Sequence, residues 1–192
     1  MVDHKRTELK FMGVVLSVFK VLYRTSFLAL IKYTNGSFSY IVAPHGMRVG
    51  QVINSFNVFN YNRSTKRLLS PGSVIVLQLL ARYSIFSNLS VNNSRQSQYA
   101  RSAGTYCQLV EKFEDYGLAL IKLPTGTNKI ISLESYVVLG RNSNIMNKFS
   151  VFGKAGLRRR AGFKPIVRGV ARNPVDHPNG GRTKTNKPEK SL

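Results

Sequence analysis

The stretch "TYCQLVEKFEDYGLALIKLPTGTNKIISLESYVVLG", residues 105–140, contains four short strand-like segments separated by close turns. The segments cover residues 105–113, 118–123, 129–133 and 135–140, and the turns between the first three are "EDYG" and "PTGTN". Strands this short, joined by turns this close, are typical of a small barrel and not of a large sandwich. The stretch therefore predicts an all-β meander that closes on itself.

Strand signals continue towards the N-terminus. The fully apolar run "VIVLQLL" (74–80) predicts another buried strand, and the Ser- and Asn-rich residues 81–98 are expected to form a polar loop. Further back, residues 26–33 and 37–42 are two apolar runs that flank Asn35 and Gly36. An Asn-Gly pair supplies the positive φ angles of a tight hairpin turn, so the two runs predict a β-hairpin.

Positive charge is the strongest global signal. The chain of 192 residues has 29 Lys and Arg against 8 Asp and Glu, a formal net charge of +21. Residues 148–192 alone hold 12 basic and 2 acidic side chains. A compact protein with this surplus repels itself unless a polyanion neutralises it. Nucleic acid is the expected partner, because each neutralised phosphate also releases counterions.

Several other classes of protein are disfavoured. The most apolar stretch, residues 14–31, is interrupted by Lys20 and Arg24, so we expect no membrane span. Cys107 is the single cysteine, which excludes an internal disulfide and favours a buried apolar role for this side chain. The three histidines, His4, His45 and His177, show no metal-ligand spacing. We therefore expect neither a metal site nor a cofactor.

The turn "ARSAGTY" (100–106) is a first candidate for RNA contact. It would present the guanidinium of Arg101 and the hydroxyl of Ser102 just before a strand. Gly104 lacks the side chain that would block close approach to a sugar–phosphate backbone. The same residues are equally compatible with a plain polar turn that leads into a strand.

The segment "GKAGLRRRAGFKPIVRG" (153–169) is a second candidate, since its glycines recur among closely spaced basic residues. Basic side chains reach phosphates, and glycines let the backbone follow a grooved surface. The segment lacks enough apolar surface to offset the entropy of ordering, so we expect it to gain a stable shape only against a partner. The alternative is a solvated basic tail, which would have little use for Phe163, Pro165 and Ile166.

His177 stands with Asp176 between two prolines, in "NPVDHPNGG". A general base needs an orienting partner, but neighbours in an extended chain point apart, and no nucleophile elbow is present. A hydrolase that uses His177 is therefore disfavoured. An imidazole can donate and accept hydrogen bonds and can stack on a base, so a nucleotide contact is the favoured interpretation.

Four segments resemble one known family, in that family's order. These are "ARSAGTY" (100–106), "GKAG" (153–156), "VRGVARNPVDHPNGG" (167–181) and, more loosely, "YIVAPHGMRVGQVI" (40–53). They are similar to the universal large-subunit ribosomal protein family called L-two. The resemblance implies an oligonucleotide-binding-type barrel, then an SH3-like barrel, then a basic C-terminal tail in large-subunit ribosomal RNA near the peptidyl transferase centre. It also implies that the protein is not an enzyme, since catalysis there belongs to RNA.

Together, the resemblance and the charge pattern predict four regions and a set of contacts. Residues 1–55 form an incomplete first barrel, 56–70 a connector, 71–140 the SH3-like barrel, and 141–192 a short helix followed by the basic tail. The predicted RNA-binding residues are Arg101, Ser102, Gly104, Lys154, Gly156, Arg158, Arg159, Arg160, Lys164, Arg168, Arg172, Asn173, Asp176, His177, Arg182 and Lys184.

Three departures from the resemblance carry expectations of their own. Only a dozen residues precede Gly13, so we expect another ribosomal protein, a separate polypeptide or RNA to complete the first barrel. Asn179 stands where the family has a second histidine, and Arg160 stands where the family has a tryptophan. These departures, with the Asn-, Ile-, Phe- and Tyr-rich composition, predict a mitochondrial protein made inside the organelle. The competing hypothesis is a free-standing RNA-binding translation or ribosome-assembly factor.

Overall fold

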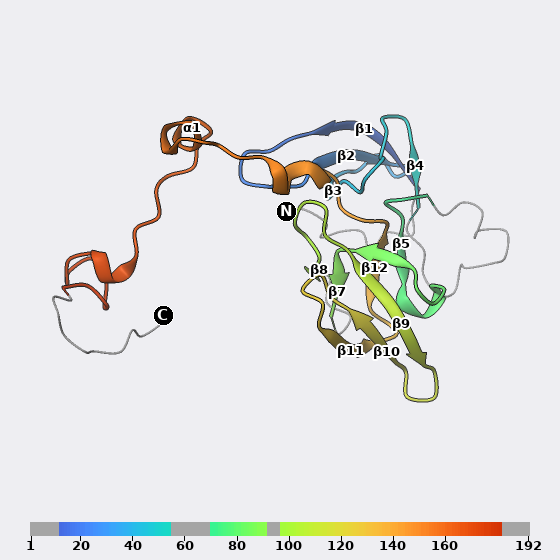
Figure 1. Ribbon diagram of the computed structural model, residues 1–192. Helices are drawn as coiled ribbons and strands as arrows, with labels where there is room; N and C mark the ends of the chain where they lie inside the picture. Colours follow the sequence, from blue (N-terminus) through green and yellow to red (C-terminus); the bar gives the residue numbers. More distant parts are fainter. Residues whose placement is uncertain (1–11, 55–69, 92–96, 182–192) are drawn as a thin grey trace. The chain divides into compact units, whose positions relative to one another are not determined.

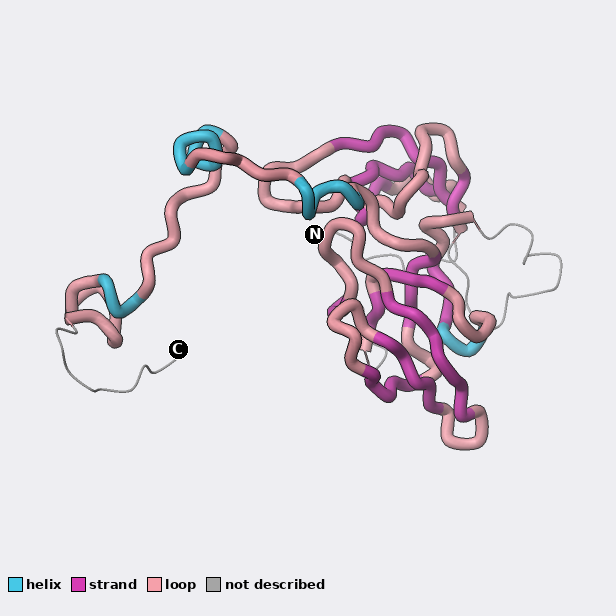
Figure 2. Tube along the Cα trace, viewed as in Figure 1, coloured by secondary structure: helices cyan, strands magenta, loops and turns pink. Residues whose placement is uncertain are grey.

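The computed structural model describes residues 12–54, 70–91 and 97–181 and divides the chain into two compact units, residues 1–150 and 151–192 (Figure 1). All twelve strands of the described residues lie in the first unit, while the second contains short helices and loops (Figure 2). The all-β prediction is confirmed. The predicted connector lies almost wholly outside the described residues.

The first sheet has four antiparallel strands in the order β3-β2-β1-β4. Their bounds are β1 Gly13–Phe19, β2 Leu28–Tyr33, β3 Phe38–Val42 and β4 Val52–Ile53. The predicted hairpin is confirmed, with Leu28 opposite Val42 in the register. Alternate residues turn inward, so Val15, Ile31 and Ile41 are fully buried in one core.

The second sheet has six strands in the order β11-β10-β9-β6-β12-β5. Their bounds are β5 Val74–Val76, β6 Ile85–Ser87, β9 Cys107–Phe113, β10 Leu118–Lys122, β11 Asn128–Ser132 and β12 Tyr136–Leu139. The meander predicted from the opening stretch is confirmed, and its last strand pairs back onto β5 and β6. Phe86, Leu109 and Ile121 lie in its core.

The polar-loop prediction for residues 81–98 is wrong. This segment contains β6, β7 (Leu89–Ser90) and most of β8 (Ser97–Tyr99). Phe86 and Leu89 are both fully buried, so the few apolar residues of this Ser- and Asn-rich segment direct the chain into the core. Within 74–80, the strand ends at Val76 and a 3-10 turn, Leu77–Leu79, follows.

Two short helices lie in the first part of the region for which a short helix is predicted, residues 141–192. They are a 3-10 helix, Ile145–Phe149, and the α-helix of the described residues, α1, Ala155–Arg160. Its residues Ala, Leu and Arg have high helix propensity. Gly162, with φ of +89°, follows the C-cap Ala161, a position where a left-handed glycine commonly ends a helix.

The two sheets are joined by backbone hydrogen bonds between distant segments. Pro44 and Asn142 form a β-bridge, and the His45 N–H donates to the Arg141 carbonyl at 2.8 Å. The Ser143 N–H donates to the Ala43 carbonyl at 3.1 Å. These contacts hold the loop after β3 against the chain that follows β12, at the junction between the two sheets.

Cys107 is fully buried, as its apolar sequence context predicts, and burial raises the pKa of its thiol to about 12. Since the thiolate is the reactive species, we expect the native protein not to react with a thiol reagent near pH 8. Full reaction is expected once a denaturant unfolds the chain. Because this is the single cysteine, the denatured sample is its own control, and rapid labelling of native protein would contradict the packing described here.

Candidate nucleic-acid interface

The turn at residues 100–106 is held by one buried side chain. Asn142, with no exposed surface, donates from Nδ2 to the Ala100 carbonyl at 2.6 Å and the Ser102 carbonyl at 3.1 Å. The Thr105 hydroxyl donates to the same Ser102 carbonyl at 2.7 Å. Arg101 and Ser102 are exposed, so the turn is fixed from beneath while its two predicted RNA-binding side chains face outward.

Gly104 has an intrachain reason to be glycine. Its φ is +66°, and a Cβ placed there would lie 3.1 Å from the Ile145 Cα. Its N–H also donates to the Ser143 carbonyl at 3.0 Å. The missing side chain is predicted to permit close approach of RNA, and the positive φ and the close packing against the 3-10 helix also favour glycine at this position.

The loop between β1 and β2 lies beside this turn. The Thr25 hydroxyl accepts a hydrogen bond from the Ala103 N–H at 3.1 Å, across 78 positions of sequence. A cavity of about 420 Å³ is lined by Tyr23, Arg24, Thr25, Ser26, Arg101 and Ser102. Tyr23, which is 86% exposed, and Arg24 therefore lie beside the predicted RNA-binding residues Arg101 and Ser102. No local sequence motif indicated this role for Tyr23 or Arg24.

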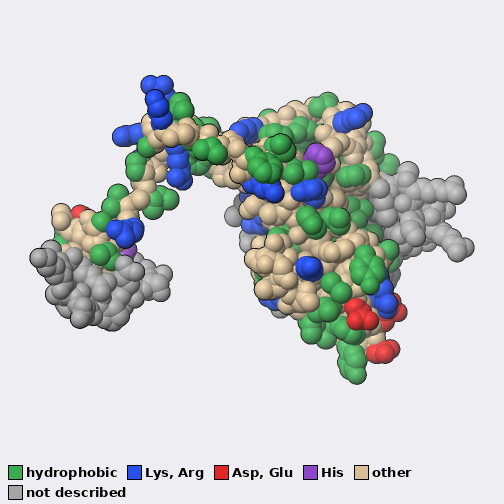
Figure 3. Space-filling model, viewed as in Figure 1, with side chains coloured by type: hydrophobic (Ala, Val, Ile, Leu, Met, Phe, Trp, Pro, Cys, Tyr) green, Lys and Arg blue, Asp and Glu red, His purple; other side chains and the backbone are tan. Residues whose placement is uncertain are grey.

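The second unit contains most of the predicted contacts but has no core. None of the side chains in residues 151–181 is buried. These residues include seven Lys or Arg and one carboxylate, that of Asp176. Lys and Arg side chains project from α1 in several directions (Figure 3). This part of the chain is shaped by turns and charge, with little apolar burial.

Phe163 organises the chain around α1. Its ring lies 6.1 Å from the ring of Phe152 in an edge-to-face arrangement, and the Arg158 guanidinium lies 5.8 Å from its centroid. A shallow cavity of about 430 Å³ lies between the helix and residues 163–166. Of the predicted residues, Lys154 caps the helix and Gly156, Arg158, Arg159 and Arg160 form it, while Lys164 lines this cavity.

The Pro-Val-Asp-His-Pro run is folded into a compact bend. His177 accepts a hydrogen bond at Nδ1 from the Asn179 N–H at 3.1 Å, and the Gly181 N–H donates to the Arg172 carbonyl at 2.9 Å. A Cβ on Gly169 would lie 2.4 Å from the His177 ring, so the ring rests directly on that glycine. The predicted residues Arg168, Arg172, Asn173, Asp176 and His177 all belong to this bend, while Arg182 and Lys184 lie outside the described residues.

The bend does not have the arrangement of a catalytic base. The ring nitrogen of His177 contacts a backbone N–H and not the Asp176 carboxylate. Across the described residues, no three His, Cys, Asp or Glu side chains lie close enough together to hold a metal ion. Nor does any helix of the described residues have the length and apolarity to cross a membrane.

Within the described residues of the first unit, the carboxylates gather at one end of β9. Glu111, Glu114, Asp115 and Glu134 lie around the far end of β9 and the turns beside it, where acidic side chains gather in Figure 3. The turn at residues 100–106 lies before the first residue of β9, Cys107. Because β9 has seven residues, roughly 20 Å of extended strand separates the acidic end of β9 from the 100–106 turn.

Comparison with known proteins decides the family. Residues 70–192 match the description "Ribosomal Proteins L2, C-terminal domain", and residues 1–55 match "Ribosomal Proteins L2, RNA binding N-terminal domain". The chain belongs to the ribosomal protein L2 family. The resemblance found in four short motifs is therefore confirmed over most of the sequence. The family is structural and not enzymatic, which removes the hydrolase alternative.

The L2 relatives include bacterial and mitochondrial proteins. The chain is 41% identical over 184 residues to large ribosomal subunit protein uL2 of Orientia tsutsugamushi, which covers 94% of this chain and 63% of the relative. It is 37% identical over 180 residues to large ribosomal subunit protein uL2m of Reclinomonas americana, and the match covers 94% of this chain and 62% of that protein. For large ribosomal subunit protein uL2 of Rhodospirillum centenum, the identity is 39% over 158 residues, and the match covers 82% of this chain and 54% of that protein. The chain thus spans little more than half to about three fifths of these L2 proteins.

Proposed function

We propose that this chain is a structural constituent of the large subunit of a mitochondrial ribosome, where it binds large-subunit ribosomal RNA near the peptidyl transferase centre and supports assembly and translation. The observation that carries the proposal is the second unit. Residues 151–181 have seven basic side chains, one acidic side chain and none that is buried. A chain of this kind is stabilised by phosphates and not by a core of its own.

The geometry of α1 supports contact with RNA on several sides. Successive residues on an α-helix are about 100° apart, so Arg158, Arg159 and Arg160 radiate around the axis. A flat RNA surface would satisfy only some of them. Converging RNA strands would satisfy all three, which is the environment expected for a tail that runs into the subunit.

His177 is proposed to contact RNA through Nε2. Since Nδ1 accepts the Asn179 N–H, a neutral imidazole has its proton on Nε2, where it can donate to a phosphate or a base. The Gly169 contact fixes the ring, so this donor is held in place before RNA arrives. Asn179, in the place of the family's second histidine, contributes its backbone N–H to the same arrangement.

Replacement of His177 by Ala is expected to leave the first unit folded and to reduce subunit assembly or peptide-bond formation about tenfold, the cost of one hydrogen bond to a charged group. The measurements are the yield of assembled large subunits and a single-turnover peptide-transfer assay. Val175→Ala is the matched control, because Val175 lies in the same bend and is 90% exposed. If both variants behave like the wild type, the role proposed for His177 is withdrawn.

The first sheet provides a surface for a protein neighbour. In the described residues, β3 pairs on one side only, with β2, and β4 pairs with two residues of β1. We propose that another polypeptide covers the open β3 edge, as unpaired edges in native proteins are usually protected. The amides of Phe38–Val42 should then exchange with solvent more slowly in the assembled particle than in free protein.

Co-sedimentation tests the proposal as a whole. A constituent of the mitochondrial particle should remain with large subunits from lysed mitochondria after a high-salt wash, because a tail enclosed by RNA resists removal. Release of the chain by the wash while subunits stay intact would favour a free-standing translation or assembly factor. Recovery with cytosolic ribosomes would overturn the mitochondrial assignment.

A further inference from the structure

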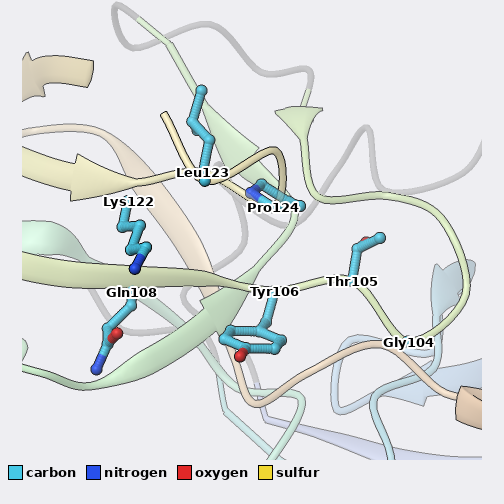
Figure 4. Close-up of a pocket in the computed structure, with 8 residues that line it drawn as sticks. Gly104, Thr105, Tyr106, Gln108, Lys122, Leu123 and Pro124 are labelled. Atoms are coloured by element: carbon cyan, nitrogen blue, oxygen red, sulfur yellow. The ribbon is translucent and has the colours of Figure 1, made fainter. Parts of the chain in front are cut away.

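A second cavity lies on the other side of the turn at residues 100–106. It has a volume of about 280 Å³ and lies between the start of β9, the end of β10 and the turn after β10 (Figure 4). Gln108 and Lys122 line it from β9 and β10, Tyr106 lines it from the position just before β9, and Leu123 and Pro124 line it from the turn. The volume approaches that of the smaller ligand sites in proteins, about 300 Å³.

Strand geometry explains why three side chains meet here. Side chains alternate along a strand, so Tyr106 and Gln108 face outward while Cys107 and Leu109 are fully buried. Lys122 is the cross-strand partner of Gln108 in the β9–β10 register, which places the two side chains on the same face. An amide and an ammonium are thus presented together by β9 and β10, beside the aromatic ring of the residue that precedes β9.

Tyr106 is held in position from outside the cavity. The Arg141 guanidinium lies 5.5 Å from the ring centroid, and its Nη2 donates to the Gly104 carbonyl at 3.2 Å. Arg141 is not part of the cavity lining. Tyr106 is 41% exposed, so part of the residue remains available to a ligand.

The polar groups of the cavity indicate an anionic ligand with hydrogen-bonding edges. None of the side chains that line it is acidic. Lys122 is exposed, and its side chain makes no ion pair or hydrogen bond within the described residues. Gln108 donates from Nε2 to the Tyr83 carbonyl at 3.3 Å, which orients the amide and leaves its oxygen as an acceptor.

We propose that this cavity binds one unpaired nucleotide of RNA, with the base stacked on Tyr106, the amide of Gln108 at the base edge and Lys122 at a phosphate. This inference rests on the proposed RNA-binding function and specifies which part of the RNA this cavity binds. Aromatic stacking requires an exposed base face, which a single strand offers and a continuous duplex does not. The cavity shares the 100–106 turn with the cavity beside Tyr23, so a strand that contacts Arg101 can place a nearby base here.

The test compares binding of a short single-stranded oligoribonucleotide with binding of the same sequence in a duplex, using the full chain at one fixed salt concentration. Tyr106→Ala should weaken single-strand binding about tenfold and leave duplex binding nearly unchanged. Tyr106→Phe should stay within about twofold of the wild type, because the ring is kept. In a separate titration over a series of salt concentrations, Lys122→Gln should reduce the salt slope of single-strand binding by about one unit.

Tyr116→Ala is the matched control, since Tyr116 is 79% exposed in the turn between β9 and β10, at the opposite end of β9. Photocrosslinking of wild-type protein to a thiouridine-containing strand, with the crosslinked peptide identified by mass spectrometry, gives a readout that needs no variant. A crosslink on the peptide that contains Tyr106 supports the proposal.

Two results would overturn the nucleotide site: unchanged single-strand affinity in Tyr106→Ala, or equal losses for single strand and duplex. In either case, retained binding of wild-type protein to a large-subunit ribosomal RNA fragment would leave the proposed function standing. If the wild type bound no RNA at all, both would fail.

Discussion

Ending the chain at Phe152 is expected to flatten the salt dependence of RNA affinity by several units on a log–log plot. Residues 153–192 contain eleven Lys and Arg. Each phosphate neutralised on RNA contributes roughly −0.7 to −0.9 to the slope, and six to ten such contacts correspond to about 10³- to 10⁵-fold in affinity between low and physiological salt. The tail should therefore account for most of the affinity measured at low salt.

The truncated chain should nevertheless remain folded. Residues 1–150 form a compact unit, and no side chain of residues 151–181 is buried. Thermal unfolding of the shortened chain, followed by circular dichroism, checks this point. A chain that ends at Gly181 separates the contribution of the bend from that of the last eleven residues. Parallel salt slopes for the full and shortened chains would show that the tail does not bind phosphate.

Asn142→Ala is expected to destabilise the first unit by about 3 kcal/mol. The substitution removes one of two donors to the Ala100 carbonyl, which keeps the Asn88 N–H at 3.1 Å, and it removes the acceptor for Asn88 Nδ2 at 3.2 Å. Each buried polar group that loses its partner costs about 1–3 kcal/mol. The alanine also leaves space where the amide was packed, so the expected loss is larger than that of a single hydrogen bond.

Urea denaturation measures the loss, and the midpoint should fall without a change in slope. Asn128→Ala is the control, because Asn128 is exposed on β11, and its change should stay within about 0.5 kcal/mol. RNA affinity of the folded Asn142→Ala protein should also fall, since the 100–106 turn loses its support. A loss of stability below about 1 kcal/mol would mean that Asn142 does not organise this turn.

The strands were predictable because their signal is local. The Asn-Gly turn and the close turns of residues 105–133 define hairpins from a few neighbouring residues, and the structure confirms them. Residues 81–98 were mispredicted because the buried residues Phe86 and Leu89 lie in a short, interrupted apolar stretch within a polar segment. Their burial depends on neighbours in β9 and β12, which no local window contains.

The composition of the candidate interface was predictable, but its assembly was not. Clustered arginines and glycines marked the tail from the sequence alone. The contributions of Tyr23 and Asn142 depend on hydrogen bonds across 78 and 40 positions. The contact of His177 with Gly169 also requires the bend to be formed. Long-range pairing of this kind leaves no short pattern in one sequence.

The separation of carboxylates from the 100–106 turn along β9 has a kinetic consequence. A positively charged body whose carboxylates gather at one end has an electric dipole, and the field of a polyanion exerts a torque on it before contact. The protein should therefore approach RNA with the acidic β9–β10 hairpin pointing away from it. A larger fraction of collisions would then lead to binding. Reversing Glu114 and Asp115 to lysine, far from any proposed contact, should shift the association rate and its ionic-strength dependence more than the dissociation rate.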